Sequence, residues 1–295
     1  MPFMANSQRS RVRVLLIVIA LAFITAMLAI PYLVRGPRIR QVRYSSTWQG
    51  STGGLIKSTD PAGIAYHAPS GHLFLVDSEI DEISQWHGVN VFELSLDLAQ
   101  MFGSYDTVTD PREPTGVTYN AFDGYFYVTN DATHRIYRFG NGFGEPIASV
   151  NTLGDVRNAR DPEGITSDPA TGFLYVADGN GGGRQILAYD INLEYRGRFY
   201  VGDVLDDPEG IAYEPVSHHL FVVSSTNIAE YTLDGMLVNV FSISGFYPPP
   251  IAPQGLVFAP SSDPYDEPTA LSLYIVDGMT DNFPDGRIYE AMIMK

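Results

Sequence analysis

The positions of this sequence that could carry chemistry form two sets. Each set has one member in each of five repeats along the chain. One set precedes a recurring glycine and comprises Ala62, Thr115, Glu163, Glu209 and Gln254. The other ends a recurring apolar strand and comprises Asp77, Asn130, Asp178, Ser224 and Asp277. Five of these ten positions are carboxylates, so a surface on which they meet would attract cations.

A calcium site is the most specific chemistry that these residues offer. Ca²⁺ takes roughly six to eight oxygen ligands, and Glu163, Glu209, Gln254 and Asp178 could supply them from neighbouring repeats. The alternative is structural, because Asp before Pro and Asp after a strand accept backbone hydrogen bonds in turns. Since the same residue types recur in every repeat, the structural interpretation is favoured, and Ca²⁺ is the one cofactor that the sequence suggests.

Other catalytic chemistry has little support in the sequence. The chain contains no cysteine, which excludes thiol catalysis and thiolate metal sites. Its six histidines lie at unrelated positions, and no Gly-x-Ser-x-Gly elbow is present. The positions expected to face a central channel are small and uncharged: Ala65, Thr118, Thr166, Ala212 and Val257.

A repeated sequence motif, which we call the phrase, must position the candidate residues. It has the form Pro-x-Gly followed by an apolar residue, and its glycines stand at 63, 116, 164, 210 and 255. The intervals of 53, 48, 46 and 45 residues match the roughly 40–50 residues of a four-stranded propeller blade. Each phrase opens a short strand, which is followed by a turn and a nearly continuous apolar strand such as Leu73-Phe74-Leu75-Val76.

The sequence therefore predicts an all-β fold, a β-propeller of four-stranded blades over residues 58–295. Five repeats predict five blades, with six as the alternative if one blade is too degenerate to recognise. The chain ends just after the third strand of the last repeat, and a strand-like segment at 40–44 stands before the first. We expect this segment, within a linker of residues 35–57, to close the last blade as its outer strand and cover its edge.

The repeat phrase, with a second strand ending in Val-Asp or Val-Ala-Asp, resembles the repeats of NHL-type propellers and their relatives around regucalcin and the gluconolactonases. The resemblance covers about residues 58–295 and specifies a blade rather than an activity. Regucalcin-like lactonases use a Glu/Asn/Asp metal site at the mouth of the channel. The resemblance thus implies a metal-dependent hydrolase in which Glu163 or Glu209 acts as the base.

The N-terminal region predicts a membrane anchor. Residues 14–34 include Val14, Leu21, Phe23 and Tyr32, and their only polar members are Thr25 and Tyr32. These 21 residues are long enough to span a lipid bilayer as one transmembrane helix. They follow a basic tail, residues 1–13, and lack the small-x-small exit of a cleaved signal peptide.

Charge separates the N-terminal region from the rest of the chain. Residues 1–43 contain seven of the 18 basic side chains and no acidic ones, so the remaining 252 residues carry a net charge of about −23. Such an acidic globule does not bind nucleic acid. An anchor followed by an acidic propeller predicts a single-pass membrane protein with its propeller in the periplasm or the extracellular space.

Three functions are consistent with these features. The first is a non-catalytic accessory subunit of a membrane protein complex, which would bind other membrane protein subunits through an exposed apolar prominence at Phe246, Tyr247 and Pro249. The alternative is a Ca-dependent lactonase or hydrolase of the regucalcin-gluconolactonase type. A second alternative is a module that binds cell-wall or other carbohydrate. The sequence favours the first function because no complete catalytic constellation is recognisable in it.

Overall fold

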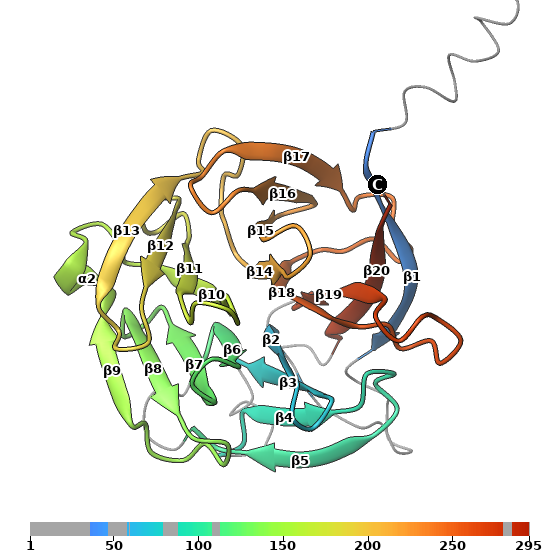
Figure 1. The fold of residues 1–295 in the computed structure, drawn as a ribbon, viewed down its shortest axis with the longest axis horizontal. Helices are drawn as coiled ribbons and strands as arrows, with labels where there is room; N and C mark the ends of the chain where they lie inside the picture. The colour runs from blue at the N-terminus through green and yellow to red at the C-terminus, as the bar shows by residue number, and fades with distance from the viewer. Residues whose placement is uncertain are drawn as a thin grey trace, which may run out of the picture. The chain divides into compact units, whose positions relative to one another are not determined.

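The computed structural model describes residues 36–46, 58, 60–78, 88–107, 113–279 and 285–294. In these residues the strands form five four-stranded sheets, which are the blades of a β-propeller (Figure 1). The prediction of five blades is confirmed, and the alternative of six is wrong. The anchor expected at residues 14–34 lies outside the described residues. Within them, no helix has the length and apolar character needed to cross a membrane.

The blades follow one another along the chain, and each runs from an inner first strand to an outer fourth strand. Blade 1 contains β2 (Pro61–His67), β3 (His72–Asp77), β4 (Val91–Leu94) and β5 (Met101–Tyr105). Blade 2 contains β6 (Gly116–Asn120), β7 (Tyr125–Asn130), β8 (Arg135–Phe139) and β9 (Ala148–Asn151), and a short helix, α2 (Thr152–Asp155), follows it. Blade 3 contains β10 (Pro162–Ser167), β11 (Leu174–Asp178), β12 (Gln185–Tyr189) and β13 (Tyr195–Tyr200).

The last two blades complete the circle. Blade 4 contains β14 (Ile211–Glu214), β15 (His219–Ser224), β16 (Asn227–Tyr231) and β17 (Leu237–Ser242). Blade 5 contains β18 (Pro253–Pro260), β19 (Leu271–Asp277), β20 (Arg287–Met294) and β1 (Arg38–Ser46). In this blade β1 pairs with β20 as the outer strand, so the predicted closure by the N-terminal strand is confirmed.

The hydrophobic core lies between neighbouring blades. The second strands are apolar along their length because both of their faces are covered, as in β11, where all five residues are buried. Five clusters of buried side chains result, and each joins two adjacent blades. Tyr127 and Tyr189, for example, pack in the cluster that joins blades 2 and 3. Because the blades are packed on each other, the core is closed only when all five are present.

The repeated glycines form a ring that we call the glycine collar: Gly63, Gly116, Gly164, Gly210 and Gly255. A Cβ on Gly63 would lie 2.6 Å from the Cα of Gly116, and a Cβ on Gly116 would lie 2.7 Å from the carbonyl oxygen of Glu163. The contacts continue around the ring until a Cβ on Gly255 would lie 2.6 Å from the carbonyl oxygen of Ala62. The inner strands therefore touch backbone to backbone, and only glycine fits.

A second repeated interaction locks each phrase to its own blade. The side chain that ends the second strand hydrogen-bonds the backbone of the first residue of the phrase. Asp77 accepts from the N–H of Asp60 at 3.1 Å, and Asp277 accepts from the N–H of Ala252 at 2.7 Å. Asp178 and Ser224 accept the equivalent N–H in blades 3 and 4, whereas in blade 2 the side-chain amide of Asn130 donates to the carbonyl oxygen of Glu113. This pairing explains why polar residues recur at the ends of buried strands.

The closing strand is held by side-chain contacts as well as by strand pairing. Nε of Arg43 lies 2.7 Å from Oε2 of the buried Glu290, and Nη2 of Arg43 donates to the carbonyl oxygen of Leu96 at 2.9 Å. Gln41 forms two hydrogen bonds with the backbone of Tyr247. Arg43 thus connects the last blade to the loop after β4 in the first.

Replacing Arg43 with alanine is expected to lower the free energy of unfolding by about 1–3 kcal/mol, because it leaves the buried Glu290 carboxylate without its charged partner. Chemical denaturation of the full chain measures this loss. Arg40→Ala is the matched control, since the exposed Arg40 only approaches the sulfur of Met292 at 3.6 Å and its loss should change stability by less than about 0.5 kcal/mol. Equal effects of the two substitutions would contradict a specific role for Arg43.

Candidate functional site

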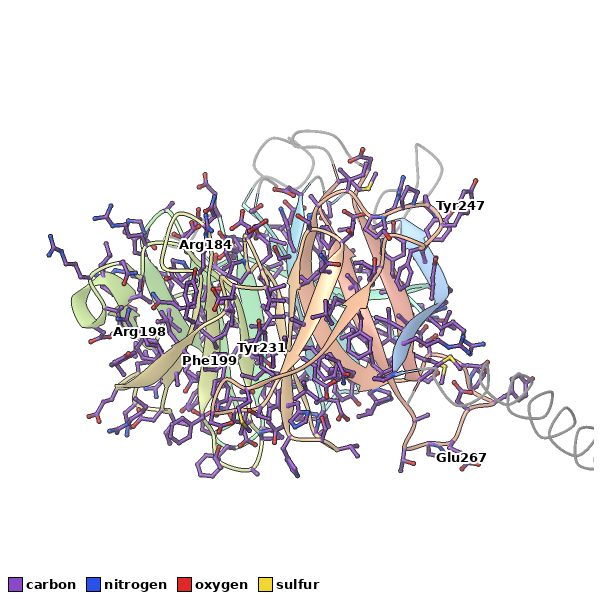
Figure 2. All side chains as sticks on the ribbon, turned by 90° about the horizontal axis from the view of Figure 1, so that it is seen from above. Arg184, Arg198, Phe199, Tyr231, Tyr247 and Glu267 are labelled. Atoms are coloured by element: carbon purple, nitrogen blue, oxygen red, sulfur yellow. The ribbon has the colours of Figure 1, made fainter. Side chains whose placement is uncertain are left out.

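Carboxyl groups gather at the end of the propeller where the first strands begin and the second strands end. We call Asp131, Asp161, Glu163, Asp207 and Glu209 the acidic mouth. Glu163 and Glu209 directly precede collar glycines, and Asp131 directly follows β7. Figure 2 shows Arg184, from the loop after β11, and Tyr247 toward one end of the propeller and Glu267 at the opposite end.

Three members of the acidic mouth could share a cation. One carboxylate oxygen each from Asp131, Asp161 and Glu163 lies within 4.8 Å of the other two, and all three residues are partly buried. Carboxylate oxygens are the donors that Ca²⁺ prefers. In the described part of the chain, no ion pair engages any of the three. The donor type and spacing therefore fit a hard divalent cation.

The acidic mouth also shifts the proton affinity of its two glutamates. Burial raises the pKa of Glu163 well above its ordinary value, and the charges of Glu209 and Asp161 raise it further. Burial also raises the pKa of Glu209 to about 8, with further contributions from Asp207 and Asp161. A carboxyl group that titrates near neutral pH can both accept and donate a proton there, as acid–base catalysis requires.

The glycine-rich loop after β11 donates hydrogen bonds to two carboxylates of the acidic mouth. Oδ2 of Asp161 accepts the N–H of Gly181 at 2.6 Å, and Oδ1 of Asp207 accepts the N–H of Asn180 at 2.6 Å. Its backbone N–H groups therefore donate to one carboxylate of blade 3 and one of blade 4, and hold both in place.

The structure separates Asp178 from the other predicted ligands. Its buried carboxylate accepts the N–H groups of Asp161 and Gly183 and the side-chain amide of Gln185, at 2.6–3.0 Å. These donors occupy both of its oxygens. These bonds are the ones that the turn interpretation expects of Asp178, and the carboxyl groups close enough to share a cation are those of Glu163, Asp131 and Asp161.

Gln254 lies beside Glu209 in a cavity of about 210 Å³. Asp207 and Ser225 also line this cavity. Oε1 of Gln254 is buried and has no hydrogen-bond partner among the described residues. A buried carbonyl oxygen without a donor is costly, so the side-chain amide of Gln254 is the least satisfied polar group beside this cavity.

The predicted partner surface is only partly exposed. Tyr247 is 82% exposed and Pro249 is exposed, but Phe246 is 7% exposed, contrary to the expectation for all three. The ring of Phe246 packs against Tyr289, with 5.8 Å between the ring centroids, inside the core between blades 4 and 5. Phe246 is thus a core residue. Its burial could not be predicted because it lies outside the repeated strands, where no alternating pattern shows which side chains face the core.

Sequence reasoning did not select Asp131 and Asp161 as site residues. Asp161 was assigned to turn chemistry as the first residue of its phrase, and Asp131 stands one position beyond the repeated strand end. The only signal was an irregularity, since the positions equivalent to Asp131 in the other blades hold serine or glycine: Ser78, Gly179, Ser225 and Gly278.

Comparison with known proteins identifies the architecture. No protein-family model matches the chain, and no curated protein sequence matches it significantly. The glutaminyl cyclase of Myxococcus xanthus is 13% identical, with a TM-score of 0.60 over 88% of this chain and 98% of that one. A gluconolactonase of Xanthomonas campestris is 14% identical, with a TM-score of 0.51 over 88% of this chain and 96% of that one. At these identities the likeness shows the propeller fold.

Proposed function

We propose that the protein is a hydrolase that opens a lactone, with the acidic mouth as its active site. The observation that carries this proposal is Glu209, a carboxyl group whose pKa is raised to about 8 and which lines a cavity. The gluconolactonase that shares the propeller architecture suggests the substrate class. The hydrolase is preferred to the non-catalytic accessory role, because a non-catalytic surface has no need of a buried carboxyl group that titrates near neutral pH, as Glu209 does.

The reaction needs one group that moves a proton twice. Ionised Glu209 accepts a proton from a water molecule as the water oxygen attacks the lactone carbonyl carbon. Glu209 then donates that proton to the ring oxygen as the carbon–oxygen bond of the ring breaks, which yields a hydroxy acid and restores the carboxylate. Gln254 lines the same cavity as Glu209, so its side-chain amide would hydrogen-bond a hydroxyl group of a substrate bound there.

Asp131, Asp161 and Glu163 would hold a divalent cation, with Ca²⁺ favoured by their oxygen donors. When bound, the cation would supply Lewis-acid polarisation of the carbonyl oxygen. The contribution of the chain is to keep these three carboxylates close together in spite of their mutual repulsion. The hydrogen bond from Gly181 to Asp161 serves this purpose.

The test combines cation binding with hydrolysis. After chelation, added Ca²⁺ is expected to raise the Tm of the full chain, since a ligand of the folded state stabilises it. Asp131→Asn should remove this increase, while Glu267→Gln, at the opposite end, should keep it. A panel of lactones is then followed by the release of acid, with and without Ca²⁺, Mg²⁺ or Mn²⁺. Hydrolysis no faster than in protein-free buffer, under all of these conditions, would refute the proposal.

The membrane anchor at residues 14–34 and the placement of the propeller in the periplasm or extracellular space stay predictions from the sequence. Both are compatible with a hydrolase. Binding to other membrane protein subunits and binding to carbohydrate likewise stay predictions. Tyr247 has an exposed side chain, so a contact with another subunit would be examined first at this residue.

A further inference from the structure

A second cavity lies at the other end of the first strands. It measures about 300 Å³, and aromatic rings from four blades line it: Tyr66, Tyr119, Tyr213 and Phe258. We call it the aromatic pocket. It shares no lining residue with the cavity at Glu209, because its aromatic residues lie near the ends of the first strands, whereas Glu209 precedes the start of one. The two cavities can therefore bind different molecules.

Three of the five positions expected to face the channel line the aromatic pocket. Thr118, Thr166 and Val257 line it as expected, whereas Ala65 and Ala212 pack into the cores between blades. The five positions keep the same pairing with the second strands, as Ala65 with Phe74 and Thr118 with Tyr127 show. The residue that follows each position lines the pocket in every blade, including Tyr66 and Tyr213 after the two alanines.

The aromatic walls are held in place by neighbouring residues. The hydroxyl of Tyr213 lies 2.6 Å from Nδ1 of His218. The ring of Tyr119 meets that of His67 edge-on, with 4.4 Å between centroids, and packs on Phe126 at 5.2 Å. A ligand would therefore enter a pocket that is already formed and would lose little free energy in ordering it.

The polar groups of the pocket have few hydrogen bonds left to offer. Oγ of Ser167 donates to the carbonyl oxygen of Tyr119 at 3.2 Å, and Oγ1 of Thr166 accepts the N–H of Tyr213 at 3.0 Å. Thr118 is 7% exposed, and among the described residues its hydroxyl has one contact, a long one of 3.4 Å with Oγ of Ser167. None of the described residues that line the pocket carries a charge. Of the serine and threonine hydroxyls in the pocket, that of Thr118 is thus the one best able to bond a ligand.

We propose that the aromatic pocket binds a small, uncharged aromatic molecule with one hydroxyl or N–H group, which bonds Thr118. Flat rings suit a site lined by tyrosine and phenylalanine, because aromatic rings attract one another in tilted or offset arrangements. A charged ligand would lose its hydration without gaining an ionic partner. The volume admits a molecule of one or two rings, at the lower end of the range for ligand sites, about 300–1,000 Å³.

The test compares two probes that differ chiefly in charge, benzyl alcohol and benzoate. Each is titrated calorimetrically into the full chain and into protein-free buffer. Benzyl alcohol is expected to bind one saturable site with a Kd of about 1 mM or tighter, and benzoate at least about tenfold more weakly. No saturable binding of benzyl alcohol, or equal binding of benzoate, would overturn the proposal.

Two variants locate the site. Ala121→Trp, in an exposed turn that lines the pocket, should fill the entrance and weaken benzyl alcohol binding at least tenfold. Ala132→Trp is the matched control, in an exposed turn at the other end of the same blade, and should leave binding unchanged. Thr118→Val should weaken binding about 3- to 10-fold. If benzyl alcohol binds Ala121→Trp as well as it binds the original chain, the aromatic pocket is not the site.

Discussion

Gly164→Ala is expected to prevent the propeller from folding or to lower its free energy of unfolding by more than about 4 kcal/mol. The added Cβ would lie 2.7 Å from the carbonyl oxygen of Glu209, and 2.8 Å from the Cα of Gly210 and from the backbone nitrogen of Ile211. All three atoms belong to the backbone of the next blade. They can move away only if the collar opens, which would separate packed blades around the whole ring.

Gly154→Ala is the matched control for this substitution. Gly154 lies in α2, and apart from its chain neighbours and the backbone of its own helix, no atom lies within 4 Å of the position that a Cβ would take there. Alanine is the better helix former by about 1 kcal/mol, so this variant should be as stable as the original chain or slightly more so. Thermal and urea unfolding of both variants measure the difference. A Gly164→Ala chain that unfolds within a few degrees of the original would show that the collar can adapt.

Glu209→Gln is expected to lower lactone hydrolysis by about 10²- to 10⁴-fold. This prediction rests on the proposed function, in which the Glu209 carboxylate accepts the proton of the attacking water. The amide of glutamine has a similar size but cannot accept that proton. The rate in the original chain should rise with pH and level off at or below about pH 8, because the pKa of Glu209 is about 8 without a cation and a bound cation would lower it.

The same substitution should have the opposite effect on stability. The folded chain holds a proton on Glu209 up to about pH 8, whereas an unfolded glutamate loses it near pH 4.5. The unfolded state therefore binds fewer protons across this window, and stability falls as the pH rises through it. Glu209→Gln removes this loss, so the variant should be more stable than the original chain at pH 8 in the absence of divalent cations.

Loss of activity together with a gain in stability at high pH distinguishes a catalytic carboxyl from a structural one. Glu267→Gln, an exposed residue at the opposite end, should change neither property. A Glu209→Gln chain that hydrolyses the same lactone at an undiminished rate would contradict the role of Glu209. If that chain is also less stable at pH 8, Glu209 serves the fold instead.

The architecture could be predicted from the sequence because a repeat imposes the same local rules many times. Each phrase carries a proline, a glycine and an apolar strand at similar spacing, so an error in one repeat is corrected by the other four. Closure by β1 was predictable because the fifth repeat lacks a fourth strand. Phe246 was missed because it lies outside every repeat, where no pattern shows whether a side chain faces the core.

By itself, the sequence determined the propeller class, the five recognisable repeats, the strand that closes the circle and the end at which carboxyl groups meet, and the structure decided between five blades and six. Only the tertiary structure decided which carboxyl groups act together. Asp178, at a strand end, accepts hydrogen bonds from backbone donors, whereas Asp131, one position beyond the strand end of another blade, approaches Asp161 and Glu163. Proton affinity and cation binding depend on distances of a few ångströms between blades and on burial, and these are set by how the glycine collar brings separate repeats together.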